Sequence, residues 1–129
     1  MRETVNVAII SNARILLVRK KQSWLLPGGK PELGESDIEC LCREAYEELS
    51  GTQLENIRHY DDFIGNTHRG EKFKTKVYLA DIKGELGKPS AEITEHRWVD
   101  DTSQYNLSDM NFKVIHSLIN NEYLRSPSD

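Results

Sequence analysis

The first part of the chain contains short apolar runs of the length of β-strands. Two apolar runs, residues 5–10 and 14–19, flank Ser11-Asn12, a pattern that predicts a β-hairpin lying largely in the interior. A third short run, Trp24-Leu25-Leu26, ends at Pro27-Gly28-Gly29, which breaks regular structure. Further strands are predicted over residues 58–64, 72–81 and 96–99.

Two other segments have a helical period. Ser36, followed by Glu39 three residues later, predicts a capping box at a helix start. Apolar residues then recur at helical spacing until Ser50-Gly51: Ile38, Leu41, Cys42, Ala45 and Leu49. Residues 111–124 predict a second helix, packed through Phe112, Ile115, Leu118 and Ile119. Because strands and helices are mixed rather than strictly alternating, we expect a mixed β-sheet between helices.

Size and charge narrow the class of protein. A chain of 129 residues fits one domain over residues 1–129, with residues 126–129 as a loose end. A net charge of −4 gives no global attraction for nucleic acid or an anionic membrane, so neither is an expected partner. A polyanionic ligand would therefore need a local basic patch or a bound metal. The oligomeric state stays open, with a homodimer as one alternative.

The cysteines and the apolar stretches indicate the compartment. Cys40 and Cys42 are two positions apart on the predicted helix, so they point to opposite sides and do not bond each other. Reduced thiols fit a cytoplasmic protein. The start lacks a signal-peptide pattern, and no apolar stretch is long enough to span a bilayer, so we expect a soluble protein.

Three glutamates gather on the first predicted helix. At 100° per residue, Glu44 and Glu48 lie about 40° apart and Glu47 lies roughly 60° from Glu44. A solvated acidic face is one interpretation. Like charges four residues apart nevertheless destabilise a helix, and only Arg43 is close enough to relieve them. Hard divalent cations prefer oxygen ligands, so the cluster suits Mg²⁺ or Mn²⁺ rather than zinc.

The residues before the cluster complete a longer pattern. The sequence G29-x5-E35-x7-R43-E44-A45-x-E47-E48 resembles the signature of the Nudix hydrolases, G-x5-E-x7-R-E-U-x-E-E-x-G-U with U apolar. Ser50 takes the glycine position and Gly51 the apolar one, so we expect the turn after the helix to be shifted by one residue. The stretches VNVAIISNARILLVRK, WLLPGGK and EHRWVD also look like Nudix segments, so the resemblance covers essentially the whole chain.

The resemblance implies a fold and a chemistry. The fold is an α/β/α sandwich, and the activity is Mg²⁺-dependent cleavage of a nucleoside diphosphate linked to another group. Glu44, Glu47 and Glu48 would be metal ligands or the base that deprotonates the attacking water, and the Gly28 carbonyl would add a ligand. Glu35 and Arg43 would pair to hold the loop against the helix. The alternative for this pair is an ordinary surface ion pair.

Phosphate-binding and later acidic residues are also implied. Arg19, Lys20 and Lys30 flank the cluster in sequence, and the resemblance places Arg19 and Lys30 near the phosphates. Surface charge is their alternative role. Gly29 would present backbone groups to metal and phosphate. A further ligand or base often comes from a later loop in this family; Glu92 and Glu95 are candidates, and Glu95 is favoured because it is nearer the strand. A solvated position is the alternative for both.

Substrate choice leaves several alternatives. Neither the proline typical of ADP-ribose hydrolases nor the tyrosine typical of diadenosine polyphosphate hydrolases occurs in the expected window, which holds Thr67, His68 and Arg69. The chain looks most like the MutT-like branch, which converts nucleoside triphosphates to monophosphates and pyrophosphate. In that branch a polar residue ahead of the last helix binds the base; Asn111 holds this place, or caps the helix. Other Nudix substrates are nucleotide sugars, dinucleoside polyphosphates and capped RNA, and a non-catalytic nucleotide-binding module is a further alternative.

Overall fold

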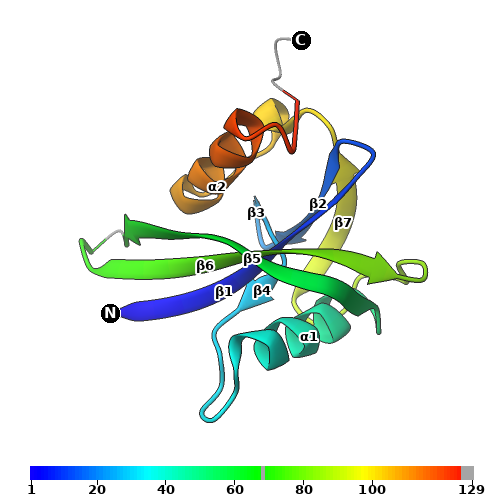
Figure 1. The fold of residues 1–129 in the computed structure, drawn as a ribbon, viewed down its shortest axis with the longest axis horizontal. Coiled ribbons are helices and arrows are strands. Elements are labelled where there is room, and N and C mark those ends of the chain that lie inside the picture. The colour runs from blue at the N-terminus through cyan, green and yellow to red at the C-terminus, as the bar shows by residue number, and fades with distance from the viewer. Residues whose placement is uncertain (68, 126–129) are drawn as a thin grey trace.

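A mixed β-sheet lies between two helices in the computed structural model (Figure 1), which describes residues 1–67 and 69–125. His68 and the predicted loose end, residues 126–129, lie outside the described residues. The strands are β1 (Arg2–Ser11), β2 (Arg14–Lys20), β3 (Ser23–Leu25), β4 (Gly28–Gly29), β5 (Gln53–Asn66), β6 (Lys72–Lys83) and β7 (Ile93–Val99). The helices are α1 (Asp37–Glu48), α2 (Asp109–Asn120) and the short 3-10 helix η1 (Thr102–Gln104). The predicted α/β/α sandwich is confirmed.

The sheet is organised around β1. This strand runs parallel to β6 and antiparallel to β4, while β5 continues the sheet beyond β6. β2 pairs with β1 only next to their connecting turn, then turns away to pair with β3 and β7. The predicted hairpin is confirmed. Its turn residues are Asn12 and Ala13, which both have positive φ, as in the type I′ turns that suit the twist of β-hairpins.

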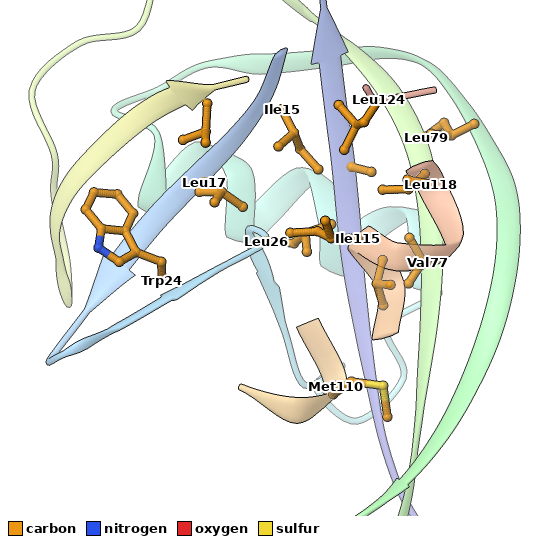
Figure 2. Close-up of a cluster of buried hydrophobic side chains, with 13 residues drawn as sticks. Ile15, Leu17, Trp24, Leu26, Val77, Leu79, Met110, Ile115, Leu118 and Leu124 are labelled. Carbon is orange, nitrogen blue, oxygen red and sulfur yellow. The ribbon is translucent and has the colours of Figure 1, made fainter. Parts of the chain in front are cut away.

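Each face of the sheet carries its own hydrophobic core. On the α2 face, Ile15 and Leu17 of β2 pack with Ile115 and Leu118 of α2 (Figure 2). The intervening residues of β2 point the other way, into a second core that contains Leu41 and other α1 residues. A strand buried on both faces has a continuous apolar run, which is why the run in β2 does not alternate.

The buried side of α1 differs from the predicted one. The capping box is present, since Ser36 Oγ accepts from the Glu39 amide at 3.1 Å and Glu39 Oε1 accepts from the Ser36 amide at 3.0 Å. Ile38 and Cys42, however, are exposed, so their predicted burial is wrong. The buried residues of the helix and its C-cap are Cys40, Leu41, Ala45, Glu48 and Leu49. The helix buries Glu48 rather than Ile38 and Cys42 because it packs against β4, the Gly28–Gly29 strand, as well as against the apolar sheet.

The turn after α1 is not shifted, contrary to expectation. Ser50 itself adopts the left-handed conformation, with φ of 54°, directly after the C-cap residue Leu49. The Gly51 amide donates to the Tyr46 carbonyl at 2.8 Å. This is the Schellman arrangement, in which the residue after the C-cap usually is glycine. A serine therefore occupies a glycine conformation, and the helix keeps its end.

The other element boundaries also differ from the predictions. Helix α2 begins at Asp109, with Ser108 as N-cap, and ends at Asn120, and Phe112, predicted on its packed side, is 61% exposed. Strand β5 is longer than predicted. Its register shifts twice, and these shifts destroy the two-residue period on which the prediction depends. No helix in the described ranges has the length and apolar character needed to cross a membrane.

Candidate active site

The site is built on a glycine pair that lies against α1. Gly28 has a φ of 148°, and a Cβ there would lie 2.2 Å from the Val5 carbonyl oxygen, so only glycine fits. Its amide donates to Glu48 Oε1 at 2.9 Å. A Cβ on Gly29 would lie 2.5 Å from Glu44 Oε1. The missing side chain of Gly28 therefore lets β4 lie close against β1, and that of Gly29 lets the Glu44 carboxylate approach the backbone of β4.

An arginine ties the preceding loop to the same helix. Arg43 Nε donates to Glu35 Oε2 at 2.7 Å, and a terminal nitrogen donates to Glu35 Oε1 at 2.9 Å. Its other terminal nitrogen donates to Glu44 Oε1 at 2.9 Å and lies 3.6 Å from Glu47. Hydrogen bonds from Arg43 lower the pKa of Glu35 to about 2. The pair expected from the sequence is present, and the same arginine partly neutralises the acidic cluster.

These elements enclose an acidic pocket of about 420 Å³. Glu44, Glu47 and Glu48 all line it, together with Gly28 and Gly29 of β4. The remaining lining residues are Arg2, Thr4, Lys20, Lys30, Ala91 and Glu92. The structure thus brings together three predicted carboxylates, both glycines and Lys30.

The basic groups around the acidic pocket do not fully neutralise its carboxylates. Burial raises the pKa of Glu48 to about 7, although the Gly28 N–H opposes this shift, and Glu44 adds to it. Burial also raises the pKa of Glu44, against the effect of Arg43. A cation placed among these oxygens would favour their ionised forms, so the pocket is electrostatically suited to bind one.

The donor set fits a hard divalent cation. Within the described residues, no three His, Cys, Asp or Glu side chains form a ready-made metal site. Glu44 and Glu48 instead bond protein donors, Arg43 and the Gly28 amide. The pocket still offers several carboxylate oxygens and room for water, which is the environment that Mg²⁺ prefers. Glu44, Glu47 and Glu48 would hold the ion.

Two predicted residues on β2 and β7 are engaged with each other. Arg19 donates to Glu95 at 2.8 Å, and Glu95 also lies 3.0 Å from Arg97. Lys20, the next residue after Arg19, and Glu92, three residues before Glu95, line the acidic pocket instead, where Lys20 Nζ lies 2.6 Å from Glu92. This follows from the alternation of β2: Ile15 and Leu17 face α2, as Arg19 does, whereas Leu16 and Val18 face α1, as Lys20 does.

A second pocket, of about 300 Å³, adjoins the acidic pocket and shares Arg2, Thr4, Lys20 and Gly29 with it. This adjoining pocket is also lined by residues of several elements: Asn6, Leu25, Leu26, Phe73, Thr75, Ser108, Met110, Asn111 and Val114. Asn111 lies within the first turn of α2 rather than ahead of it, because Ser108 is the N-cap.

Nothing in the sequence pattern predicts Arg2 or Thr4 as site residues. They reach both pockets because β1 lies between β4 and β6, an arrangement formed by residues distant in sequence. Lys20 carries a weak signal, since it follows Arg19 at the end of an apolar strand. Its pKa is raised by its bond to Glu92.

The chain is similar to known proteins in sequence pattern and in fold. The NUDIX domain family model matches residues 1–109. The crystal structure of a MutT NUDIX hydrolase from Burkholderia pseudomallei is similar, with 28% identity and a TM-score of 0.78 over 89% of this chain and 95% of that one. The solution structure of the E. coli ORF135 protein has 25% identity and a TM-score of 0.74, covering 100% and 95% of the two chains.

A third similar structure supports the fold alone. It is the NUDIX domain of Shewanella oneidensis NrtR complexed with ADP ribose, which has 20% identity and a TM-score of 0.77 over 94% of this chain and 88% of that one. Comparison with curated protein sequences gives no match.

Proposed function

The chain belongs to the Nudix family of hydrolases, which act on nucleoside diphosphate derivatives, and from this premise we propose that it hydrolyses nucleoside triphosphates to monophosphates and pyrophosphate with the aid of Mg²⁺. The observation that carries the proposal is the convergence of Glu44, Glu47 and Glu48 with two glycines on one polar pocket. Mn²⁺ would serve the same oxygen ligands.

The residues of the acidic pocket have different roles in this reaction. A bound Mg²⁺ supplies charge neutralisation and lowers the pKa of coordinated water. Glu44, Glu47 and Glu48 hold it, with the Gly28 carbonyl as a further donor. The Arg43–Glu35 pair fixes the loop that carries the glycines, because its two short hydrogen bonds join residues eight positions apart. One of the pocket glutamates, Glu44 or Glu92, accepts the proton from the attacking water.

Basic side chains on the rim fit a polyphosphate. Arg2, Lys20 and Lys30 line the acidic pocket, and we assign the phosphate contacts to them. Arg19 is engaged with Glu95, so we assign it a supporting role. The adjoining pocket is the natural place for the nucleoside because it shares four residues with the acidic pocket.

A substrate panel tests the proposal. Purified protein is incubated with Mg²⁺ and each of several compounds: the common nucleoside triphosphates, ADP-ribose, a UDP-sugar, a diadenosine polyphosphate and a capped RNA. Chromatography identifies the products, and we expect a nucleoside monophosphate and pyrophosphate from a triphosphate. ADP-ribose is included because the Shewanella NUDIX domain binds it. Folded protein that turns over none of these compounds would refute the proposal.

Glu44→Gln separates the chemistry from the fold. We expect kcat to fall by at least about 100-fold, since the variant loses a charged ligand or base while keeping its shape. Glu55→Gln is the matched control, because Glu55 is an exposed glutamate on β5. Thermal melting checks that both variants fold. A Glu44→Gln protein with the activity of Glu55→Gln would exclude Glu44 from the reaction.

A further inference from the structure

Leu26 has an unusual hydrogen-bonding environment. It is fully buried and lies in the short segment that connects β3 to β4. Its amide donates to Asn111 Oδ1 at 3.0 Å, and its carbonyl accepts from Asn6 Nδ2 at 3.2 Å. Side-chain amides from two distant elements, β1 and α2, therefore satisfy both backbone polar groups of one buried residue.

The chemistry of the partners fixes how each asparagine is oriented. The Leu26 and Pro27 carbonyls can only accept, so Asn6 must present its NH₂ group, which lies 3.2 Å and 3.4 Å from them. The Leu26 amide can only donate, so Asn111 must present its carbonyl oxygen. The Asn111 NH₂ group donates to Ser108 Oγ at 2.8 Å. Asn6 therefore acts as a donor and Asn111 as an acceptor.

The segment held in this way leads directly to a pocket glutamate. Pro27 follows Leu26, and its carbonyl also accepts from the Val7 amide at 2.9 Å. Gly28 comes next, and its amide donates to Glu48 Oε1 at 2.9 Å. Only two peptide units thus separate the Leu26 amide from the donor that orients a buried carboxylate. A displacement of Leu26 would move the Gly28 N–H away from Glu48.

We propose that Asn6 and Asn111 are positioning residues, an amide clamp on Leu26 that holds the Gly28 N–H against Glu48 in the nucleotide-hydrolysing enzyme. This inference rests on the proposed function. It gives Asn111 a role other than base binding, since both polar groups of its side chain already bond protein groups. Loss of the clamp lowers kcat for every substrate alike, because misplacement of an active-site group slows the reaction whatever base is bound.

The experiment compares four variants by amide hydrogen exchange, measured by NMR, and by steady-state kinetics. Asn111→Leu removes the acceptor for Leu26, whereas Asn111→Asp keeps an acceptor oxygen in the same place. Asn6→Asp replaces a donor with a carboxylate that faces two carbonyl oxygens. Asn120→Leu is the matched control, because Asn120 is an exposed asparagine on the same helix. Melting curves confirm that each variant is folded.

We expect Leu26 amide exchange to accelerate about fivefold or more in Asn111→Leu, since one hydrogen bond is lost. We expect kcat to fall about 10-fold or more on purine and pyrimidine triphosphates alike, with little change in KM. Asn111→Asp should keep most of both properties, and Asn6→Asp should lose activity like Asn111→Leu. The control should match the wild type. The opposite responses of the two asparagines to the same change are the signature of the clamp.

Three results would overturn the inference. The first is unchanged Leu26 exchange in Asn111→Leu. The second is a KM increase confined to one base, which would mean that Asn111 binds the base. The third is equal loss of activity in the two aspartate variants. If the wild type hydrolyses no nucleotide, the proposed function fails, and the exchange rates of Leu26 and Gly28 alone establish or exclude the clamp.

Discussion

Replacing Glu48 with glutamine should stabilise the metal-free protein while impairing the enzyme. Glu48 is only 7% exposed, and its Oε1 accepts from the Gly28 amide. Glutamine keeps an oxygen for this hydrogen bond and removes the negative charge. The substitution therefore isolates the cost of burying a charged carboxylate in the acidic pocket.

The size of the effect follows from the pKa of Glu48, which burial raises from an ordinary 4.5 to about 7. Because the folded-state pKa is higher, the folded protein binds more protons than the unfolded chain between these two values, and its stability falls as pH rises through this window. At 1.36 kcal/mol per pH unit, the full loss is about 3 kcal/mol. Burial of the glutamine amide offsets part of it, so we expect Glu48→Gln to be more stable by about 1 to 3 kcal/mol at pH 8.

Urea denaturation followed by tryptophan fluorescence, with EDTA present, measures this difference between pH 4 and pH 8. We expect Glu48→Gln to be as stable as the wild type or slightly less stable at pH 4, because the cost of burying the amide is present at every pH, and to gain on the wild type as pH rises. Glu47→Gln is the control, because the Glu47 side chain is 48% exposed, and it should change stability by less than about 0.5 kcal/mol. With Mg²⁺ and nucleotide added, the wild type should gain more stability than Glu48→Gln. A variant no more stable than the wild type at pH 8, or a difference independent of pH, would refute the reasoning.

Three other predictions concern the residues around the site. Glu35→Gln should be less stable than the wild type at neutral pH. The difference should shrink as pH falls from about 4.5 to about 2, since Arg43 lowers the pKa of Glu35 to about 2 and the stabilising contribution of Glu35 is lost on protonation. Denaturation midpoints measured across this pH range test the prediction, and a constant difference would contradict it. Gly29→Ala should lower kcat about 10-fold or more with little loss of stability, because the new methyl group displaces only the flexible end of Glu44; kinetics and melting curves check both, and full activity would count against this packing. Ser50→Gly should raise the free energy of unfolding by about 1 kcal/mol with unchanged kcat, because Ser50 has a left-handed φ; a loss of stability in urea would show that its side-chain contacts matter more than its backbone.

Much of the fold follows from local patterns. The hairpin of β1 and β2, the capping box at Ser36 and the order of the elements were all predictable, because each depends on residues close together in sequence. The buried side of α1 was not. The apolar spacing predicts that Ile38 and Cys42 point inward. In the structure Glu48 is buried instead, because its carboxylate bonds Gly28, twenty positions earlier in β4. A polar residue on a buried face has no signal in a hydrophobic pattern.

The candidate site divides in the same way. The sequence predicted that Glu35, Arg43 and Glu44 lie close together, because all three belong to one helix and the loop directly before it. The choice between neighbours was not, because β2 is apolar on both faces and only the packing of α1 shows that the face of Lys20, rather than that of Arg19, meets the acidic pocket.

The sequence by itself determined which acidic residues and glycines are available for the proposed chemistry, because carboxylates repeated along one helix and a glycine pair before it are properties of the chain. Only the tertiary structure decided that Glu48 meets the Gly28 amide, and that Asn6 and Asn111 converge on Leu26. Asn6 and Asn111 lie far apart in sequence, and both reach Leu26 because β1 and α2 each pack against the segment between β3 and β4. Such contacts depend on how elements pack in three dimensions, which no local pattern of residues records.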